Sequence, residues 1–363
     1  MSWCLMVSVK FAVVLHGPEV VDTGLAKRAM DLLSTYGQVE AVMSGYTGVA
    51  AVIDAGLQDR VDITKMRKPS QELARLSPRN DYLILANYAK SRESALSFGG
   101  IVFSRCKADI DKPLLHIDDG ILIDWNELDQ LFSCRLARDL GLRIIVGQEE
   151  IRDTETVQGA RRVQGVIPGE SVWIDGVVVG RATSSKVVLR QAPDGKLRAD
   201  GMELKATGVD RLGRFDLHTA HVRSGSTRRT KAAPKAIDTS KSGIYFIDHS
   251  AEEAIYRCRE ASLVVTVGDD TSKIAGSLLY RFSVPIVAIT DGDEDGISSE
   301  ELRTKGSVII RLQGGTDDIV GREVKQAIFH GQKRLGGEMS ALRMAERIMR
   351  IAGDRLEWHR ICG

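Results

Sequence analysis

Residues 263–296 constrain the fold of this chain more than any other stretch, because they hold two buried-strand patterns with a helix pattern between them. The apolar and β-branched run 263–267 predicts a strand that is buried on both faces. Apolar residues then recur at helical spacing from 274 to 279, until Pro285 breaks the pattern. The run 286–289 predicts a second buried strand. This order of strand, helix and strand predicts one unit of a parallel α/β sheet.

Polar residues stand directly after the first of these strands, where ligands bind in open α/β sheets. The candidate ligand-binding residues are Gly268, Asp269, Asp270, Thr271 and Ser272. A helix that begins here offers free N–H groups and the positive end of its dipole to a phosphate, and two hydroxyl groups add further donors. The same residue types also cap helices, so ordinary capping is the alternative interpretation.

A dense acidic cluster, residues 291–296, follows the second strand. Its candidate metal ligands are Asp291, Asp293 and Asp295. We expect Mg²⁺ here, because this hard cation prefers carboxylate oxygens. A bridging Mg²⁺ would also let a phosphate approach the acidic loop at 269–270, which otherwise repels it. The alternative is a solvated turn.

The stretch resembles the GGDGT loop of the NAD kinase, diacylglycerol kinase and phosphofructokinase group. The resemblance lies in the order of strand, glycine, acidic loop, threonine and helix, followed by VPIVAI, with GDDTS in place of GGDGT. That loop binds nucleotide phosphates in those enzymes, so the resemblance implies a nucleotide-like ligand. The acidic cluster also resembles the DxD element of toprim nucleases, although no glutamate ends the strand 263–267, where toprim domains carry one.

Strand and helix patterns also alternate over the first 150 residues. Strands are expected at 9–17, 39–42, 49–53, 81–86, 113–117 and 142–146, and helices after residue 25 and over 128–140. This alternation predicts a Rossmann-like, doubly wound α/β domain over residues 1–150.

A second group of candidate site residues lies in this first domain. His16 and Glu19 follow the first strand and are the candidate catalytic residues, with His16 as a general base that Glu19 or Asp22 orients. His116 and Asp118 end another strand of the same sheet, so they and the first pair are also a candidate metal set. A histidine with a purely structural role is the alternative.

The rest of the chain divides by composition. Short strands and turn signals such as Asp175-Gly176 predict a small all-β module over 160–224, and the basic, Ser/Thr-rich residues 225–243 predict a linker. Residues 244–335 predict a second Rossmann-like domain. The apolar face of a helical tail, 336–363, is expected to pack on a domain or on a second subunit, which would give a homo-oligomer.

The composition narrows the class of protein. The 363 residues predict two or three domains, and the net charge of +1 disfavours nucleic acid and acidic membrane surfaces as partners. No apolar stretch reaches the length of a membrane span, and the start of the chain lacks the pattern of a signal peptide. The five cysteines are scattered, without a CxxC pair. We therefore expect a reduced, cytoplasmic protein.

The chain resembles an uncharacterised archaeal family, found largely in methanogens, that carries a domain of unknown function. The resemblance lies in four runs: HGPEVVDTG, NYAKS, VGDDTSKIAG and, after it, ITDGDEDG. The resemblance implies no activity. The first hypothesis is a protein that binds a nucleotide or another small phosphorylated metabolite with Mg²⁺ in the third domain. The alternatives are a non-catalytic assembly or regulatory factor, and a hydrolase or transferase centred on His16.

Overall fold

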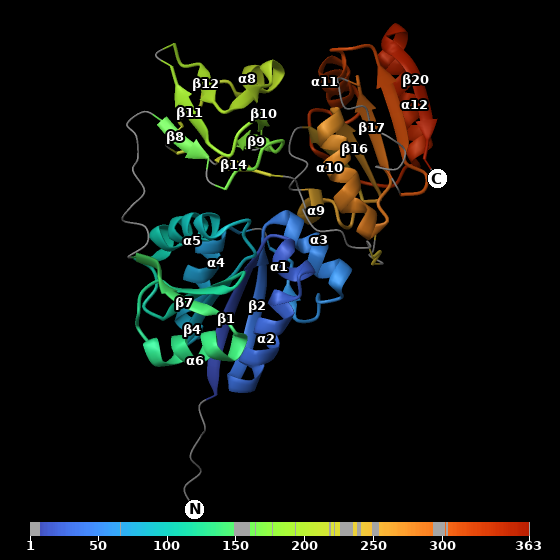
Figure 1. Ribbon diagram of the computed structural model, residues 1–363. Helices are drawn as coiled ribbons and strands as arrows, with labels where there is room; N and C mark the ends of the chain where they lie inside the picture. Colours follow the sequence, from blue (N-terminus) through green and yellow to red (C-terminus); the bar gives the residue numbers. More distant parts are fainter. Residues whose placement is uncertain are drawn as a thin grey trace, which may run out of the picture. The chain divides into compact units, whose positions relative to one another are not determined.

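The computed structural model of the protein (Figure 1) contains two compact units. The first unit comprises residues 1–44 and 67–231, and the second comprises 45–66 and 232–363. The structure describes residues 8–65, 67–148, 160–163, 165–175, 177–192, 194–217, 219–220, 222–225, 235–237, 241–248, 254–292, 302 and 304–362. None of the described helices is long and apolar enough to cross a membrane.

The first unit is built on a mostly parallel sheet in which strands lie in the order β2-β1-β4-β5-β6-β7. Their bounds are β1 (Val9–His16), β2 (Gly37–Ser44), β4 (Tyr82–Ala86), β5 (Leu114–Asp118), β6 (Ile121–Asp124) and β7 (Arg143–Val146). The pair of β5 with β6 is the antiparallel one in this set, and β7 is parallel to β6, so β6 and β7 both run opposite to the other strands. The order of connection reverses at β1, because β2 lies on one side of it and β4 on the other.

Helices cover both faces of this sheet. They are α1 (Glu19–Asp22), α2 (Leu25–Tyr36), α4 (Pro69–Leu76) with the 3-10 turn η1 (Ser77–Arg79), α5 (Arg92–Cys106) and α6 (Gln130–Leu140). Ala12 and Val14 of β1 pack in a core with Leu73 of α4. Phe11 faces the opposite side and stacks on Phe132 of α6, with ring centroids 5.6 Å apart. The alternation along β1 therefore buries both faces, as a parallel strand requires.

The module that follows in the first unit consists of two antiparallel sheets, in the orders β13-β10-β9-β14 and β12-β11-β8. Its elements are β8 (Ala160–Val163), β9 (Ser171–Ile174), β10 (Val177–Ala182), β11 (Val187–Gln191), β12 (Leu197–Asp200), β13 (Met202–Leu204), α8 (Ala206–Leu212) and β14 (Val222–Ser224). The module is therefore not all-β as expected, since it contains α8. Gly208 lets this helix pack against β10, because a Cβ there would lie 1.9 Å from the carbonyl oxygen of Val178.

The second unit has a sheet in the order β19-β15-β16-β17-β18-β20. The strands are β15 (Ile244–Asp248), β16 (Leu263–Val267), β17 (Ile286–Thr290), β18 (Val308–Leu312), β19 (Arg334–Leu335) and β20 (Leu356–Ile361). Strands β15 to β18 are parallel and follow one another in chain order, whereas β19 and β20 are antiparallel. This sheet, unlike the first, has no reversal among its parallel strands.

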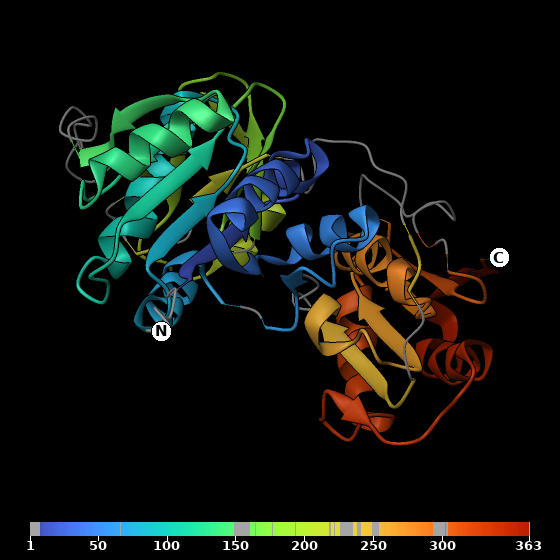
Figure 2. The same cartoon turned by 90° about the horizontal axis from the view of Figure 1, so that it is seen from below.

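Helices also lie on both faces of the second sheet, as Figures 1 and 2 show. They are α9 (Ala254–Arg257), α10 (Asp269–Leu279), α11 (Asp317–Ala327) and α12 (Ala341–Ala352), with the 3-10 turns η3 (Tyr280–Phe282) and η4 (Gly353–Arg355). Val265 and Val267 pack in one core with α11 and α12, whereas Thr266 between them contacts Ser272 of α10. The prediction of a mixed α/β chain with parallel sheets is thus confirmed.

The tail differs from the helix expected over 336–363. Helix α12 buries Met344, Ala345 and Ile348 in the core of its own unit, so its apolar face is covered within the chain. Gly353 follows the helix with a φ of 55° and begins η4, and residues Leu356–Ile361 form β20, which pairs with β18. Every residue of β20 after Leu356 is exposed, which suits a strand at the edge of a sheet.

The strand expected at 49–53 is a helix, α3 (Tyr46–Ala55), and it belongs to the second unit together with β3 (Val61–Asp62). Residues 49–53 are all apolar and all buried, and a short apolar run cannot be assigned to strand or helix from its pattern. Asp54 at the end of α3 accepts hydrogen bonds from Nε (2.9 Å) and a terminal nitrogen (2.7 Å) of Arg281. This buried ion pair joins the two chain segments that make up the second unit.

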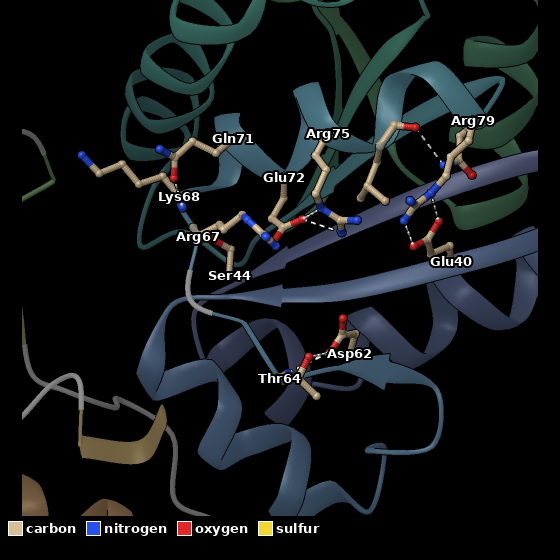
Figure 3. A network of polar contacts seen from close by, with 12 residues as sticks. Glu40, Ser44, Asp62, Thr64, Arg67, Lys68, Gln71, Glu72, Arg75 and Arg79 are labelled. Carbon is tan, nitrogen blue, oxygen red and sulfur yellow. Dashed lines mark hydrogen bonds and ion pairs between the residues drawn. The ribbon is translucent and has the colours of Figure 1, made fainter. Parts of the chain in front are cut away.

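The two ends of the 45–66 excursion are fixed in the first unit (Figure 3). The hydroxyl of Ser44, the last residue of β2, donates to the carbonyl oxygen of Arg67 at 2.6 Å. The side chain of Arg67 contacts buried Glu72 at 3.2 Å, and Arg75 contacts the other oxygen of Glu72 at 2.7 Å. The chain thus leaves and re-enters the first unit at neighbouring points.

Candidate functional site

The loop between β16 and α10 contains the predicted ligand-binding residues. Gly268 has a φ of 93°, which a residue with a side chain rarely adopts, and its position before α10 carries no side-chain cap. Asp269 is 5% exposed, and its Oδ2 accepts a hydrogen bond from the N–H of Gly292 at 2.9 Å. Asp270 is exposed. The first carboxylate is therefore engaged with the next loop, while the second faces solvent.

The two hydroxyl residues of this loop lie inside the fold. Ser272 is fully buried, donates to the carbonyl oxygen of Gly268 at 2.7 Å and lies 2.6 Å from the hydroxyl of Thr266. Thr271 is 8% exposed, and its hydroxyl lies 3.6 Å from the position of a Cβ on Gly268. These contacts tie the start of α10 to β16.

Buried carboxylates also follow the next two strands. Asp291, after β17, is 8% exposed and accepts a hydrogen bond from the N–H of Gly315 at 2.7 Å. Asp317, at the start of α11, is 4% exposed, and its Oδ2 lies 3.8 Å from a Cβ position on Gly268. The sequence reasoning missed Asp317, although its place at a helix start after the apolar run 308–312 was a usable signal. Three buried carboxylates thus come from three successive loops.

The predicted metal site is only partly within the described residues, because Asp293 and Asp295 lie outside them. Within the part of the chain that the structure describes, no three histidine, cysteine or acidic side chains are grouped closely enough to hold a metal ion. Asp269 and Asp291 each direct one oxygen to a backbone N–H of the neighbouring loop. These two hydrogen bonds therefore order the neighbouring loops.

The first sheet has a polar row at its carboxyl edge. Leu15 pairs with Ala86 and Ala86 with Ile117, so the next residues of the three strands, His16, Asn87 and Asp118, fall in one row. The Nδ2 of Asn87 donates to Asp118 Oδ2 at 3.1 Å, which turns Asn87 Oδ1 toward Nδ1 of His16 at 3.5 Å. The row lies where the strand order reverses, at β1 and β4, which is where open α/β sheets form a crevice.

Asp118 anchors this row. It is 2% exposed, and its Oδ1 accepts hydrogen bonds from the N–H groups of Ala89 and Asp119, both at 2.7 Å. Burial raises the pKa of Asp118, but the buried His116 ring, 3.4 Å away, and the two N–H groups outweigh it, so the pKa lies below its ordinary value. Asp118 is therefore held as a carboxylate in the folded protein.

The candidate catalytic residues lie beside this row. The ring of His16 stacks on Phe98 of α5, with centroids 4.4 Å apart. Glu19 and Asn87 both reach the neighbourhood of Gly17, since a Cβ there would lie 3.5 Å from Glu19 Oε2 and 3.7 Å from Asn87 Oδ1. An acceptor oxygen beside Nδ1 of His16 favours the tautomer with the proton on Nδ1 and the lone pair on Nε2. Such a histidine can act as a general base.

The fold defines an α/β protein of two units. In each unit, polar side chains gather at the carboxyl ends of the parallel strands. The chain belongs to the family described as "Uncharacterized protein conserved in archaea (DUF2117)", whose sequence profile matches residues 13–332. It is also similar to "Uncharacterized protein MJ0065" of Methanocaldococcus jannaschii, with 38% identity over 341 residues that cover 89% of this chain and 93% of that protein. No solved structure matches the chain. The expected archaeal family is confirmed.

Proposed function

We propose that the protein binds a small phosphorylated metabolite, of the nucleotide class, together with Mg²⁺ at the carboxyl edge of the second sheet. The observation that carries this proposal is the set of three buried carboxylates, Asp269, Asp291 and Asp317, from three successive loops. No three acidic side chains of the described residues are close enough to hold a cation by themselves, so in this proposal Asp291 binds the cation together with Asp293 and Asp295. The cation in turn neutralises the phosphate of a ligand that lies at the start of α10.

The start of α10 supports the part of this proposal in which the phosphate of the ligand binds to the helix. Gly268 allows close approach to the backbone, and no side chain caps the helix at this position, so its first N–H groups suit an anion. Asp269 is turned toward Gly292 and away from this role. The remaining metal ligands in this proposal are Asp293 and Asp295.

A thermal-shift assay with a panel of nucleotides tests the proposal, with and without Mg²⁺. A ligand present at a hundred times its Kd stabilises the folded protein by about 2.7 kcal/mol. The stabilisation should require Mg²⁺ and disappear in Asp291→Asn. The matched control is Asp354→Asn, which removes an exposed charge from the same unit and should keep the full shift.

Two outcomes would contradict this function. One is an unchanged melting temperature with every nucleotide and Mg²⁺, and the other is an equal loss of stabilisation in Asp291→Asn and Asp354→Asn. Co-purification of a stoichiometric protein partner from the native cells, without a retained small molecule, would favour the assembly-factor alternative.

The polar row of the first sheet favours a second candidate function, an acid–base centre of a hydrolase or transferase. In this proposal Nε2 of His16 accepts a proton from the substrate, Asn87 orients the ring, and Glu19 contacts the substrate. The reversal of strand order at β1 supports both this crevice and a Rossmann-like assignment of the domain.

Incubation of the protein with a metabolite extract, followed by mass spectrometry, tests this second function. Wild-type protein should convert at least one metabolite, His16→Gln should not, and Asp31→Asn, an exposed change on α2, should behave like wild type. Equal conversion by His16→Gln and wild type would remove His16 from the mechanism.

A further inference from the structure

A small cavity lies along β15 in the second unit. Its volume is about 170 Å³, below the roughly 300 Å³ at which pockets begin to hold drug-sized ligands. Its floor is the strand itself, from Tyr245 to Asp248. The pairing of β19 with β15 covers only Ile244 and Tyr245, and the N–H of Phe246 donates to the carbonyl oxygen of Lys333 at 3.0 Å. The cavity therefore adjoins the point where the edge pairing stops.

Three of the eight described residues that line this cavity have cationic side chains. Arg257 ends α9, Lys325 lies in the last turn of α11, and Lys333 precedes β19, so three separate segments contribute one cation each. Asp248 is the one acidic side chain among the described lining residues. The guanidinium of Arg334 lies 5.5 Å from the ring centroid of Tyr245 and adds a further positive charge close by. In a chain of net charge +1, this is a local excess of positive charge.

Two of the three cations have an ordinary explanation when taken singly. A lysine in the last turn of a helix interacts favourably with the helix dipole, which explains the position of Lys325. The same explanation covers Arg257 in the last turn of α9, but it does not cover Lys333, nor the convergence of the three cations on one cavity. All three cations would attract an anion that entered this volume. The convergence is the feature that calls for a ligand.

We propose that this cavity is a binding site for a small oxyanion, either inorganic phosphate or the phosphoryl group of a phosphomonoester. Its lining matches such a group in size and in charge, and ammonium and guanidinium groups are the usual donors to phosphate oxygens. Binding here needs no metal, since the protein supplies the positive charge. The site is thus separate in its chemistry from the carboxylate-rich edge formed by the loops after β16, β17 and β18.

The one thiol of the lining takes no part in covalent chemistry. Cys258 is 1% exposed, and burial raises the pKa of its thiol to about 12 even though Arg257 is adjacent. The thiol therefore stays protonated at neutral pH, and only a thiolate is an effective nucleophile. The cavity is a binding site in this proposal, and no group transfer to Cys258 is implied.

Isothermal titration calorimetry of the full chain with inorganic phosphate, at constant ionic strength and with EDTA present, tests the proposal. Saturable binding at one site is expected, and Lys325→Ala/Lys333→Ala should weaken it by about tenfold or more, since each tenfold corresponds to about 1.4 kcal/mol. The matched control is Lys305→Ala/Lys273→Ala, which removes the same charge from the same unit outside the lining. It should bind phosphate like wild type.

A parallel titration with glycerol 3-phosphate distinguishes the two ligand sources. Tighter binding than inorganic phosphate assigns the cavity to a phosphomonoester, and weaker binding assigns it to the free ion. The proposal is overturned if wild-type protein shows no saturable binding of either probe in EDTA, or if both double variants weaken binding equally.

Asp291→Asn separates this inference from the proposed function. The variant should retain phosphate binding in EDTA while it loses the Mg²⁺-dependent nucleotide stabilisation. Loss of phosphate binding in Asp291→Asn would place the anion at the carboxylate-rich edge and refute the cavity.

Discussion

The ion pair between Asp54 and Arg281 gives the sharpest stability prediction. The side chains are 3% and 7% exposed, and two hydrogen bonds of 2.9 and 2.7 Å join them. Asp54→Ala leaves the guanidinium buried without its carboxylate, which costs about 3–5 kcal/mol. It also removes the acceptor for the N–H of Lys235, 3.0 Å from Asp54 Oδ1. We therefore expect a loss within this range in the second unit.

Hydrogen–deuterium exchange of the peptide 263–279 measures this effect inside the second unit. Where exchange follows the opening equilibrium, 3–5 kcal/mol corresponds to roughly 10²- to 10⁴-fold faster exchange in Asp54→Ala. The matched control is Asp31→Ala, which breaks an ion pair whose side chains are 60% and 44% exposed. It should change stability by no more than about 1 kcal/mol.

A double variant tests whether the penalty comes from the unpaired charge. Asp54→Leu/Arg281→Met replaces the pair by apolar side chains and should recover most of the lost stability. An effect of Asp54→Ala as small as that of Asp31→Ala would refute the reasoning, because it would mean that the 45–66 segment contributes little to the second unit.

Three further predictions concern the first unit. The pKa of Asp118 is lower in the folded than in the unfolded state, so its carboxylate contributes to the free energy of unfolding above the unfolded pKa of about 3.9, and this contribution is lost as pH falls through the folded pKa. Asp118→Asn should therefore lower the urea midpoint at neutral pH. The decrease of the urea midpoint below about pH 4 should also be smaller in the variant than in wild type. Lys90→Met leaves Glu170, 2.6 Å from the ammonium and 14% exposed, without its cation, and should cost about 1.5–3 kcal/mol in urea unfolding, with recovery in Lys90→Met/Glu170→Gln. Gly180→Ala places a Cβ 2.1 Å from the carbonyl oxygen of Glu203 in β13, so it should lower the melting temperature and cost about 1–3 kcal/mol of folding stability. The control Gly314→Ala has open space around its Cβ and should leave the melting temperature unchanged.

Continuous apolar runs made most of the strands predictable. The runs at 263–267, 286–289 and 308–312 form β16, β17 and β18, because β-branched residues in short runs suit a strand that is buried on both faces. The run at 49–53 is equally apolar but forms part of a helix, α3. Its assignment depends on packing in the second unit, which the local pattern does not contain.

The candidate sites were predictable to a lesser degree. Sequence patterns indicated that His16 and Asp118 end strands, but the row they form with Asn87 depends on the register of three strands. The bond from Gly292 to Asp269 likewise joins loops that the sequence only places near one edge. Metal binding at Asp291, Asp293 and Asp295 and the nucleotide ligand stay predictions.

The excursion of residues 45–66 has a consequence for how the chain folds as it is made. Asp54 leaves the ribosome 227 residues before its partner Arg281. At 5–20 residues per second, this delay is roughly 10 to 45 s. The apolar helix α3 cannot reach its final packing during that time, so nascent chains should depend on chaperones until the carboxyl-terminal third emerges.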